Sequence, residues 1–255
     1  MLSMRTFAER VSRGKVLKRY IQVADKSIPI LVSPDAQLKY LKPGSSAFDT
    51  DLIEIAERYL NPNSIVWDVG ANVGVFTFAA ASVASKGSVV SIEADIWLAN
   101  ILRKTTNFKE YENQDICILP VAVSNANSVG SFMIAARGRA SNALEKAGGR
   151  SQMGGVREKQ YVPMLTLDTI LDSFQAPDFI KIDVEGAEYM VLQGANNIIE
   201  NVRPTFYVEV GDDVSENVFS LFHQNEYKAY DPLGKLLSDK CAENTFFIPE
   251  ERSPS

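Results

Sequence analysis

One short stretch of the sequence alternates acidic, amide and glycine residues in the pattern Asp68-x-Gly70-x-Asn72-x-Gly74. The run at residues 65–69 that contains its first acid is otherwise apolar, which is typical of a strand buried on both faces. A helix of apolar and small residues is predicted directly afterwards, over residues 75–85. Glycines allow a tight turn close to a ligand, and the free N–H groups at the start of the helix then face that ligand. Together these features predict the first unit of a nucleotide-binding α/β fold.

The position of Asp68 indicates which kind of nucleotide is bound. The dinucleotide fingerprint has the spacing G-x-G-x-x-G, which this stretch lacks, and a carboxylate at the strand end would repel a pyrophosphate. Asp68 suits a ligand with an ammonium or a sulfonium group, and S-adenosylmethionine (SAM) carries both. The sequence therefore predicts a SAM site. The alternative is a buried strand with a tight turn and a capping aspartate.

Glu93 is a second acid at the end of a predicted strand and lies 25 positions after Asp68 (93 − 68). In nucleotide-binding α/β folds, an acid at this place accepts hydrogen bonds from the ribose hydroxyls. A surface glutamate at a strand end is the alternative. A third apolar strand is predicted over residues 116–123, and Ser124 at its end is expected near the adenine.

Further carboxylates follow two later apolar strands. Asp183 and Glu185 come directly after the first of these strands, and Glu209 lies near the end of the second, with Asp212 just beyond it. Ligands of open α/β sheets bind beyond the carboxyl ends of the strands. The acids are therefore expected to converge on one rim of the sheet, together with Asp68 and Glu93.

This rim also offers a proton acceptor, should the methyl group of SAM be transferred to a hydroxyl. An alcohol loses its proton as the new bond forms, and a carboxylate can accept that proton. Asp183 is the expected general base, and Glu185 or Glu209 is expected to orient the acceptor. The alternative is structural, with Asp183 and Glu185 capping the following helix. If a hard cation such as Mg²⁺ takes part, Asp183, Glu209 and Asp212 are its expected ligands, because such a cation prefers oxygen.

Two segments depart from the alternation of strands and helices. Residues 1–46 are predicted as a basic appendage with two short strands, the second of which contains Pro29 and is expected at a sheet edge or outside the main sheet. Within it, residues 1–20 are expected to form a solvated helix or a contact with an anionic membrane or a partner. Residues 136–159, between two extra strands, are predicted as a flexible insertion. Its arginines either bind an anionic substrate group or lie in a solvated loop; they are Arg137, Arg139, Arg150 and Arg157.

The bulk properties limit the possible classes of protein. The 255 residues are enough for one large α/β domain, expected over residues 47–255. The net charge of −6 argues against general binding to nucleic acid, which needs a basic face. No apolar run is long enough to span a bilayer, and the N-terminus lacks the apolar core of a signal peptide. Cys117 and Cys241 fit free thiols in a reducing compartment, which predicts a cytoplasmic protein.

Several segments follow the order of one known family, and the most specific is Ile180-Lys-Ile-Asp-Val-Glu-Gly-Ala-Glu188. The others are residues 67–74, 92–94, 121–124, 166–168, 191–195 and 203–204. With these segments the chain resembles the FkbM family of SAM-dependent methyltransferases over residues 48–210. The resemblance implies a Rossmann-like class I methyltransferase fold, which is an α/β fold with a seven-stranded, mostly parallel sheet and helices on both faces.

The resemblance also implies site residues and a reaction. Asp183 and Glu185 would lie beside the acceptor, a small molecule or glycan, and the reaction would be O-methylation of a hydroxyl on a sugar or a secondary metabolite. Family members often carry a histidine soon after the glutamate of the fifth strand, whereas Val210-Gly211-Asp212 follows Glu209 here. N-methylation and a non-catalytic protein that keeps the fold and binds a partner are the alternatives. The residues implied to bind the cofactor are Asp68, Gly70, Asn72, Gly74 and Glu93.

Overall fold

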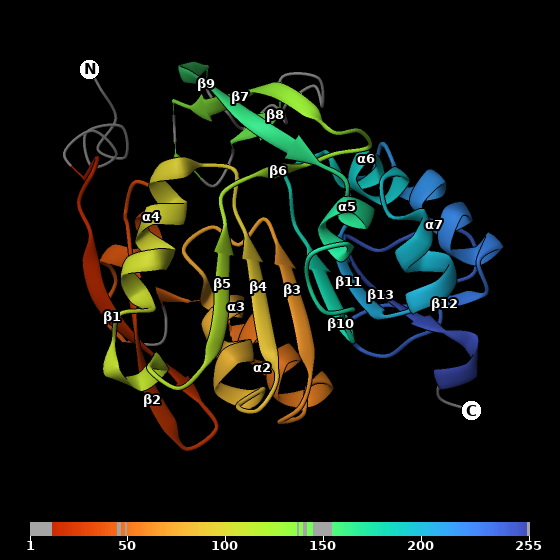
Figure 1. The fold of residues 1–255 in the computed structure, drawn as a ribbon, viewed down its shortest axis with the longest axis horizontal. Helices are drawn as coiled ribbons and strands as arrows, with labels where there is room; N and C mark the ends of the chain where they lie inside the picture. The colour runs from red at the N-terminus through yellow and green to blue at the C-terminus, as the bar shows by residue number, and fades with distance from the viewer. Residues whose placement is uncertain are drawn as a thin grey trace.

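A computed structural model describes residues 12–44, 47–48, 50–136, 138–139, 142–144 and 155–253. In these residues the chain forms a seven-stranded sheet, a four-stranded sheet and a two-stranded hairpin (Figure 1). No helix among them is both long and apolar enough to cross a lipid bilayer.

The seven-stranded sheet has the strand order β12-β13-β11-β10-β3-β4-β5. The pairings among β5, β4, β3, β10 and β11 are parallel, and β13 runs antiparallel to both β11 and β12. This arrangement confirms the predicted mostly parallel sheet. The sequence also predicts that residues 227–230 and 245–248 form a terminal antiparallel pair, which β12 and β13 confirm. The strands are β3 (Ile65–Val69), β4 (Ser88–Ile92), β5 (Asp115–Leu119), β10 (Phe179–Ile182), β11 (Thr205–Glu209), β12 (Tyr227–Tyr230) and β13 (Asn244–Pro249).

Helices cover both faces of this sheet, so its central strands are apolar on both sides. One face packs against α2 (Thr50–Tyr59), α3 (Val75–Val83) and α4 (Ile96–Thr105). The other face packs against α5 (Leu167–Leu171), α6 (Glu188–Gln193), the π-helix η7 (Ile198–Val202) and α7 (Ser215–Gln224). Short 3₁₀ turns are η1 (Leu38–Leu41), η3 (Lys109–Tyr111) and η8 (Glu250–Arg252).

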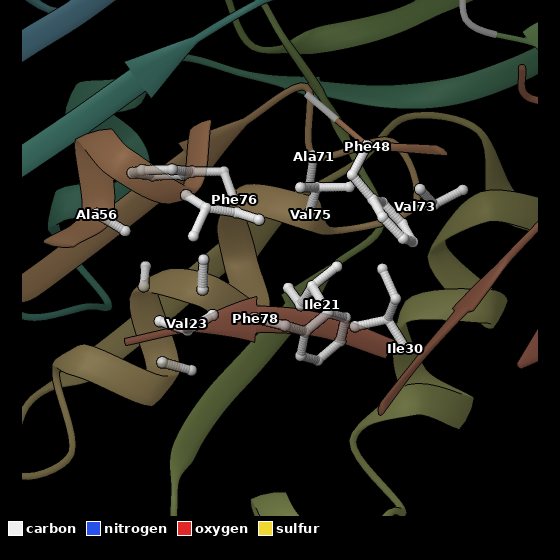
Figure 2. Packing of buried hydrophobic residues seen from close by; sticks show 14 of the residues in the cluster. Ile21, Val23, Ile30, Phe48, Ala56, Ala71, Val73, Val75, Phe76 and Phe78 are labelled. Carbon is white, nitrogen blue, oxygen red and sulfur yellow. The ribbon is translucent and has the colours of Figure 1, made fainter. Parts of the chain in front are cut away.

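The N-terminal hairpin, β1 (Leu17–Val23) and β2 (Lys26–Val32), lies outside the main sheet, as Pro29 predicts. Its apolar residues belong to the same hydrophobic cluster as α3, and Figure 2 shows Ile21 and Ile30 beside Phe78. The carbonyl of Pro29 accepts a hydrogen bond of 2.8 Å from the Tyr111 hydroxyl. The hairpin is therefore a packed layer beside α3 and α4.

The strand predicted at residues 116–123 is in fact two strands in two different sheets. β5 ends at Leu119, and β6 (Ala122–Val123) joins the four-stranded sheet, whose order is β6-β9-β7-β8. Pro120 lies at the break, where its missing N–H prevents continued pairing. The other strands of this second sheet are β7 (Ser128–Ala135), β8 (Ala143–Leu144) and β9 (Val156–Leu165). The sheet lies over the carboxyl ends of β3, β4 and β5 (Figure 1).

Three other sequence-based boundaries differ from the structure. The insertion expected at residues 136–159 contains β8 and the first residues of β9. The sequence predicts one helix from Ala187 to about Asn201, whereas the structure divides this segment between α6 and η7. Gly194 at the end of α6 packs so closely on Ser124 that a Cβ would lie 2.4 Å from its carbonyl oxygen. The sequence also predicts a helix over residues 45–60; α2 begins at Thr50, and residues 45, 46 and 49 lie outside the described residues.

Gly70 is expected to tolerate no side chain. It has a φ of 77°, and a Cβ there would lie 1.8 Å from the carbonyl oxygen of Asp183. Gly234 is a matched control, because its φ is 84° and nothing lies within 4 Å of a Cβ. Chemical denaturation should show that Gly234→Ala lowers the free energy of unfolding by about 1–2 kcal/mol. Gly70→Ala should lower it by more than about 4 kcal/mol, and equal losses would contradict the close approach.

Candidate active site

A cavity of about 430 Å³ lies at the carboxyl ends of β3, β4, β10 and β11. The main sheet, the four-stranded sheet and the segment before α2 all contribute to its walls. Of the predicted site residues, six line it: Gly70, Asn72, Glu93, Asp183, Glu185 and Glu209. The predicted rim of carboxylates is therefore largely assembled in one space.

Glu93 is held by backbone donors on both sides. Its Oε2 accepts a 2.7 Å hydrogen bond from the N–H of Asn72, and its Oε1 accepts one of 2.7 Å from the N–H of Asp95. Burial raises the pKa of Glu93 to about 8; the two backbone donors oppose this shift, and the nearby Asp95 and Asp68 add to it. The Oδ1 atom of Asn72 is buried and has no hydrogen-bond partner within the described part of the chain.

The glycine turn after β3 is fixed by its neighbours. The N–H groups of Gly70 and Ala71 both donate to the carbonyl of Ile92, at 3.0 and 3.1 Å, so the turn is tied to the end of β4. Gly74 precedes α3 with a φ of 89°, and a Cβ there would lie 2.5 Å from the Leu102 side chain. Gly74 therefore packs between α3 and α4 and does not line the cavity.

Beneath the cavity, Asp68 forms a buried ion pair with Lys181. The two residues face each other across β3 and β10, and Lys181 Nζ lies 3.2 Å from Asp68 Oδ1. Asp68 Oδ2 accepts a 2.6 Å hydrogen bond from the hydroxyl of Thr77. Burial alone would lower the pKa of Lys181, but the carboxylates of Asp68 and Asp183 outweigh it and raise that pKa above its usual value. Lys181 is therefore a permanent ammonium at this site.

This pairing changes the interpretation of Asp68. The cation that faces its carboxylate is Lys181, and Asp68 itself does not line the cavity. Lys181 does line it, donating to the carbonyl of Gly70 at 3.2 Å and approaching Asp183 Oδ2 to 3.6 Å. Sequence reasoning missed this residue, although a lysine inside the apolar strand Phe179–Ile182 was a visible signal.

At the ends of β10 and β11, the wall of the cavity combines carboxylates with amide and phenol groups. Asp183 is partly accessible, with 32% of its side chain exposed. The Tyr207 hydroxyl donates to Asn244 Oδ1 at 2.9 Å, and burial raises its pKa, so it stays protonated. Asp51 and Gln37 also line the cavity and, like Tyr207 and Asn244, were not predicted from the sequence.

Besides Asp68 and Gly74, two more of the predicted site residues lie outside the main cavity. Ser124 lines a second cavity of about 330 Å³, between β6, β7 and α6, because the chain leaves the main sheet at Pro120. Asp212 is exposed and does not line the main cavity. Among the described residues, no three His, Cys, Asp or Glu side chains are gathered as a metal site requires, so Asp183, Glu209 and Asp212 do not form one.

Two arginines of the insertion lie among the described residues, and both form ion pairs with carboxylates. Arg139 forms ion pairs with Asp35 and Asp95, and Arg157 binds Asp35 through two nitrogens. These two guanidinium groups are therefore not free to capture an anionic substrate. Arg137 and Arg150 lie outside the described residues.

Removing Lys181 is expected to strand a buried carboxylate. Lys181→Met should lower the free energy of unfolding by about 3–5 kcal/mol, because Asp68 is then buried without a compensating charge. Asp68→Asn in the same chain should recover much of that loss, which urea denaturation of the single and double variants would measure. Strictly additive losses would contradict a direct interaction between the two side chains.

Comparison with known proteins finds methyltransferases among those similar to this chain. Hexuronic acid methyltransferase AglP from Haloferax volcanii is 23% identical over 160 residues, which cover 61% of this chain and 59% of that protein. Among solved structures, methyltransferase FkbM from Methylobacillus flagellatus has a TM-score of 0.46 at 16% identity, covering 84% of this chain and 58% of that one. An O-methyltransferase from Bacillus cereus has a TM-score of 0.45 at 13% identity, covering 83% and 87%.

The family assignment rests on the sequence match rather than on these structural likenesses, whose TM-scores are below 0.5. The profile of the family described as Methyltransferase FkbM domain matches residues 68–229, which is well over half of the chain. That range begins at Asp68 and contains Glu93, Lys181, Asp183 and Glu209. The chain therefore belongs to the FkbM family of SAM-dependent methyltransferases.

Proposed function

We propose that this enzyme methylates a hydroxyl oxygen of a sugar or a related polyhydroxylated molecule. The observation that carries the proposal is that one cavity holds both the glycine turn with Glu93 and the acidic group of Asp183, Glu185 and Glu209. The hydroxyl groups of such an acceptor can donate hydrogen bonds to carboxylates that line this cavity. The name of the Haloferax relative, a hexuronic acid methyltransferase, supports a sugar acceptor.

The cofactor is proposed to lie on the β4 side of the cavity. Glu93 would accept hydrogen bonds from the ribose hydroxyls, and the unpaired Oδ1 of Asn72 offers a further acceptor. Apolar side chains from several elements would flank the adenine; they are Leu98, Val121, Phe132 and Leu144. Asp68 would act through Lys181, which holds the turn carbonyl of Gly70.

The acceptor is proposed to lie on the β10 and β11 side. When bound, SAM supplies a methyl group that its sulfonium makes electrophilic. Asp183 would accept the hydroxyl proton, and the ammonium of Lys181, 3.6 Å from its Oδ2, orients the carboxylate. Glu185 or Glu209 would hold a neighbouring hydroxyl. Much of the remaining acceleration would come from alignment of the two reactants and exclusion of water.

Other expectations from the sequence remain predictions. They are the absence of nucleic acid among the partners, the cytoplasmic location, and the division between residues 1–46 and the catalytic domain. The reaction proposed here assigns the role of proton acceptor to Asp183 and gives no role to a metal ion.

Asp183→Asn is expected to lower turnover by about 10²–10⁴-fold while leaving SAM affinity within a few fold, because the amide cannot accept the proton. Methylation of a panel of sugars and polyols with radiolabelled SAM, and calorimetric titration of the cofactor, would measure the two effects. Asp212→Asn is the matched control, since that residue is exposed and outside the cavity. Unchanged turnover in Asp183→Asn would exclude Asp183 as the base.

Cofactor affinity is expected to rise with pH up to about 8, the raised pKa of Glu93. Ribose hydroxyls donate to the ionised carboxylate, so the proton held below that pH must leave before the ligand binds. The dissociation constant of S-adenosylhomocysteine should fall by up to about tenfold per pH unit below the pKa and then level off. Glu93→Gln should bind more weakly with a flat profile, whereas a persistent slope in that variant would assign the titration to another group.

A further inference from the structure

Asp95 connects the proposed ribose-binding group to the four-stranded sheet. Its backbone N–H donates to Glu93 Oε1 at 2.7 Å. Its carboxylate is fully buried, and Oδ1 caps α4 by accepting from the N–H of Trp97 at 2.9 Å. Oδ2 accepts a 2.8 Å hydrogen bond from the Asn142 amide and forms the ion pair with Arg139. One residue thus orients Glu93 and receives two side chains from the segment that follows β7.

Arg139 is fixed from its other side by the N-terminal segment. Its Nε lies 3.2 Å from Asp35 Oδ2, and its backbone N–H donates to the Asp35 carbonyl at 2.8 Å. Its guanidinium also lies over the Trp97 ring, 4.6 Å from the centroid. Asp35 is held in turn by Arg157 of β9, through contacts of 2.9 and 3.2 Å.

The electrostatics of this network favour a fixed geometry. Burial alone would raise the pKa of Asp35, but Arg157 and Arg139 outweigh it and lower that pKa, so Asp35 stays ionised. Arg139 is 9% exposed and bridges two carboxylates that are at least as buried. Charge-assisted hydrogen bonds from a planar guanidinium hold such groups in one orientation.

We propose that Arg139 is a positioning residue for the cofactor: together with Asn142 it holds Asp95, and Asp95 aims the carboxylate of Glu93 at the ribose. Arg139 and Asn142 line the same cavity as Glu93, so replacing either residue would change the wall of the proposed cofactor site. The inference rests on the proposed ribose-binding role of Glu93. Asp35, which holds Arg139, would then support the cofactor site from far outside the strand, turn and helix that begin the nucleotide-binding unit.

Loss of Arg139 would leave the buried charge of Asp95 without its cation. Without Arg139, the buried carboxylate of Asp95 has no cationic partner among its described contacts, and an uncompensated buried charge draws in water or turns toward another donor. Either movement displaces the Asp95 N–H that holds Glu93 Oε1. The hydroxyl contacts of Glu93 should then weaken, while contacts to the rest of the ligand persist.

The test compares S-adenosylhomocysteine with its 2′-deoxy analogue by calorimetric titration, so no acceptor is required. The intact protein should bind the parent ligand about tenfold more tightly, because a hydroxyl that donates to a carboxylate is worth that much. Arg139→Gln should abolish most of this ratio, and Arg139→Lys should restore part of it. A residue that only stabilises the fold would lower the melting temperature without changing the ratio.

Matched variants separate the possible outcomes. Arg157→Gln also removes a partner of Asp35, but Arg157 contacts neither Asp95 nor the cavity, so the ratio should stay near that of the intact protein. Asn142→Ala removes the other side chain that donates to Asp95, and it should reduce the ratio even if Arg139→Gln fails to fold. A full ratio in both Arg139→Gln and Asn142→Ala, with the ratio lost in Glu93→Gln, would overturn the positioning role alone. A full ratio in Glu93→Gln would overturn the ribose-binding role as well.

Discussion

The ion pair between Asp68 and Lys181 is the interaction on which the cavity depends. Both charges are buried in the middle of the sheet, and each would cost several kcal/mol if buried alone. Their pairing therefore specifies the register of β10 against β3, because a shift of one residue would turn Lys181 to the opposite face of the sheet. The same register brings the carbonyl of Asp183 against Gly70, which is why only glycine fits there. The floor of the cavity is thus built from one charge pair and one close backbone approach.

This arrangement also makes a single ammonium common to the two proposed halves of the site. Lys181 Nζ donates to the carbonyl of Gly70 in the glycine turn and lies 3.6 Å from Asp183 on the proposed acceptor side. The hydroxyl of Thr77 satisfies the remaining oxygen of Asp68 and also contacts Ser91 on β4. A polar row consequently joins the strands β10, β3 and β4 beneath the cavity, with the hydroxyl of Thr77 on α3 as a link. Such a network resists rearrangement and holds the groups above it in place.

Local patterns were sufficient to predict much of the fold but only part of the site. The strand with its glycine turn, the acids at strand ends and the antiparallel terminal pair each follow from residues close together in the chain, and all are present. The partner of Asp68 could not be found in this way, because Lys181 lies on a strand that becomes a neighbour only through the order of the sheet. Ser124 was misplaced for a related reason: Pro120 ends one strand, and the next joins a different sheet. The role of Arg139 depends on Asp35 and Asp95, two residues that sequence periodicity does not connect.

The walls of the cavity extend beyond the range that the family profile matches. Gln37, Asp51 and Leu52 come before that range and Asn244 comes after it, yet all four line the cavity, and Asn244 accepts a hydrogen bond from Tyr207 on the proposed acceptor side. The residues proposed to contact the cofactor, in contrast, lie within the matched range, although Asp35 anchors Arg139 from outside it. Proteins that share the matched range can therefore share a cofactor site and differ in the acceptor that they methylate, because the flanking segments supply the groups that would contact it. For this chain, the identity of the acceptor is a question about Gln37, Asp51 and Asn244 as much as about the carboxylates at the strand ends.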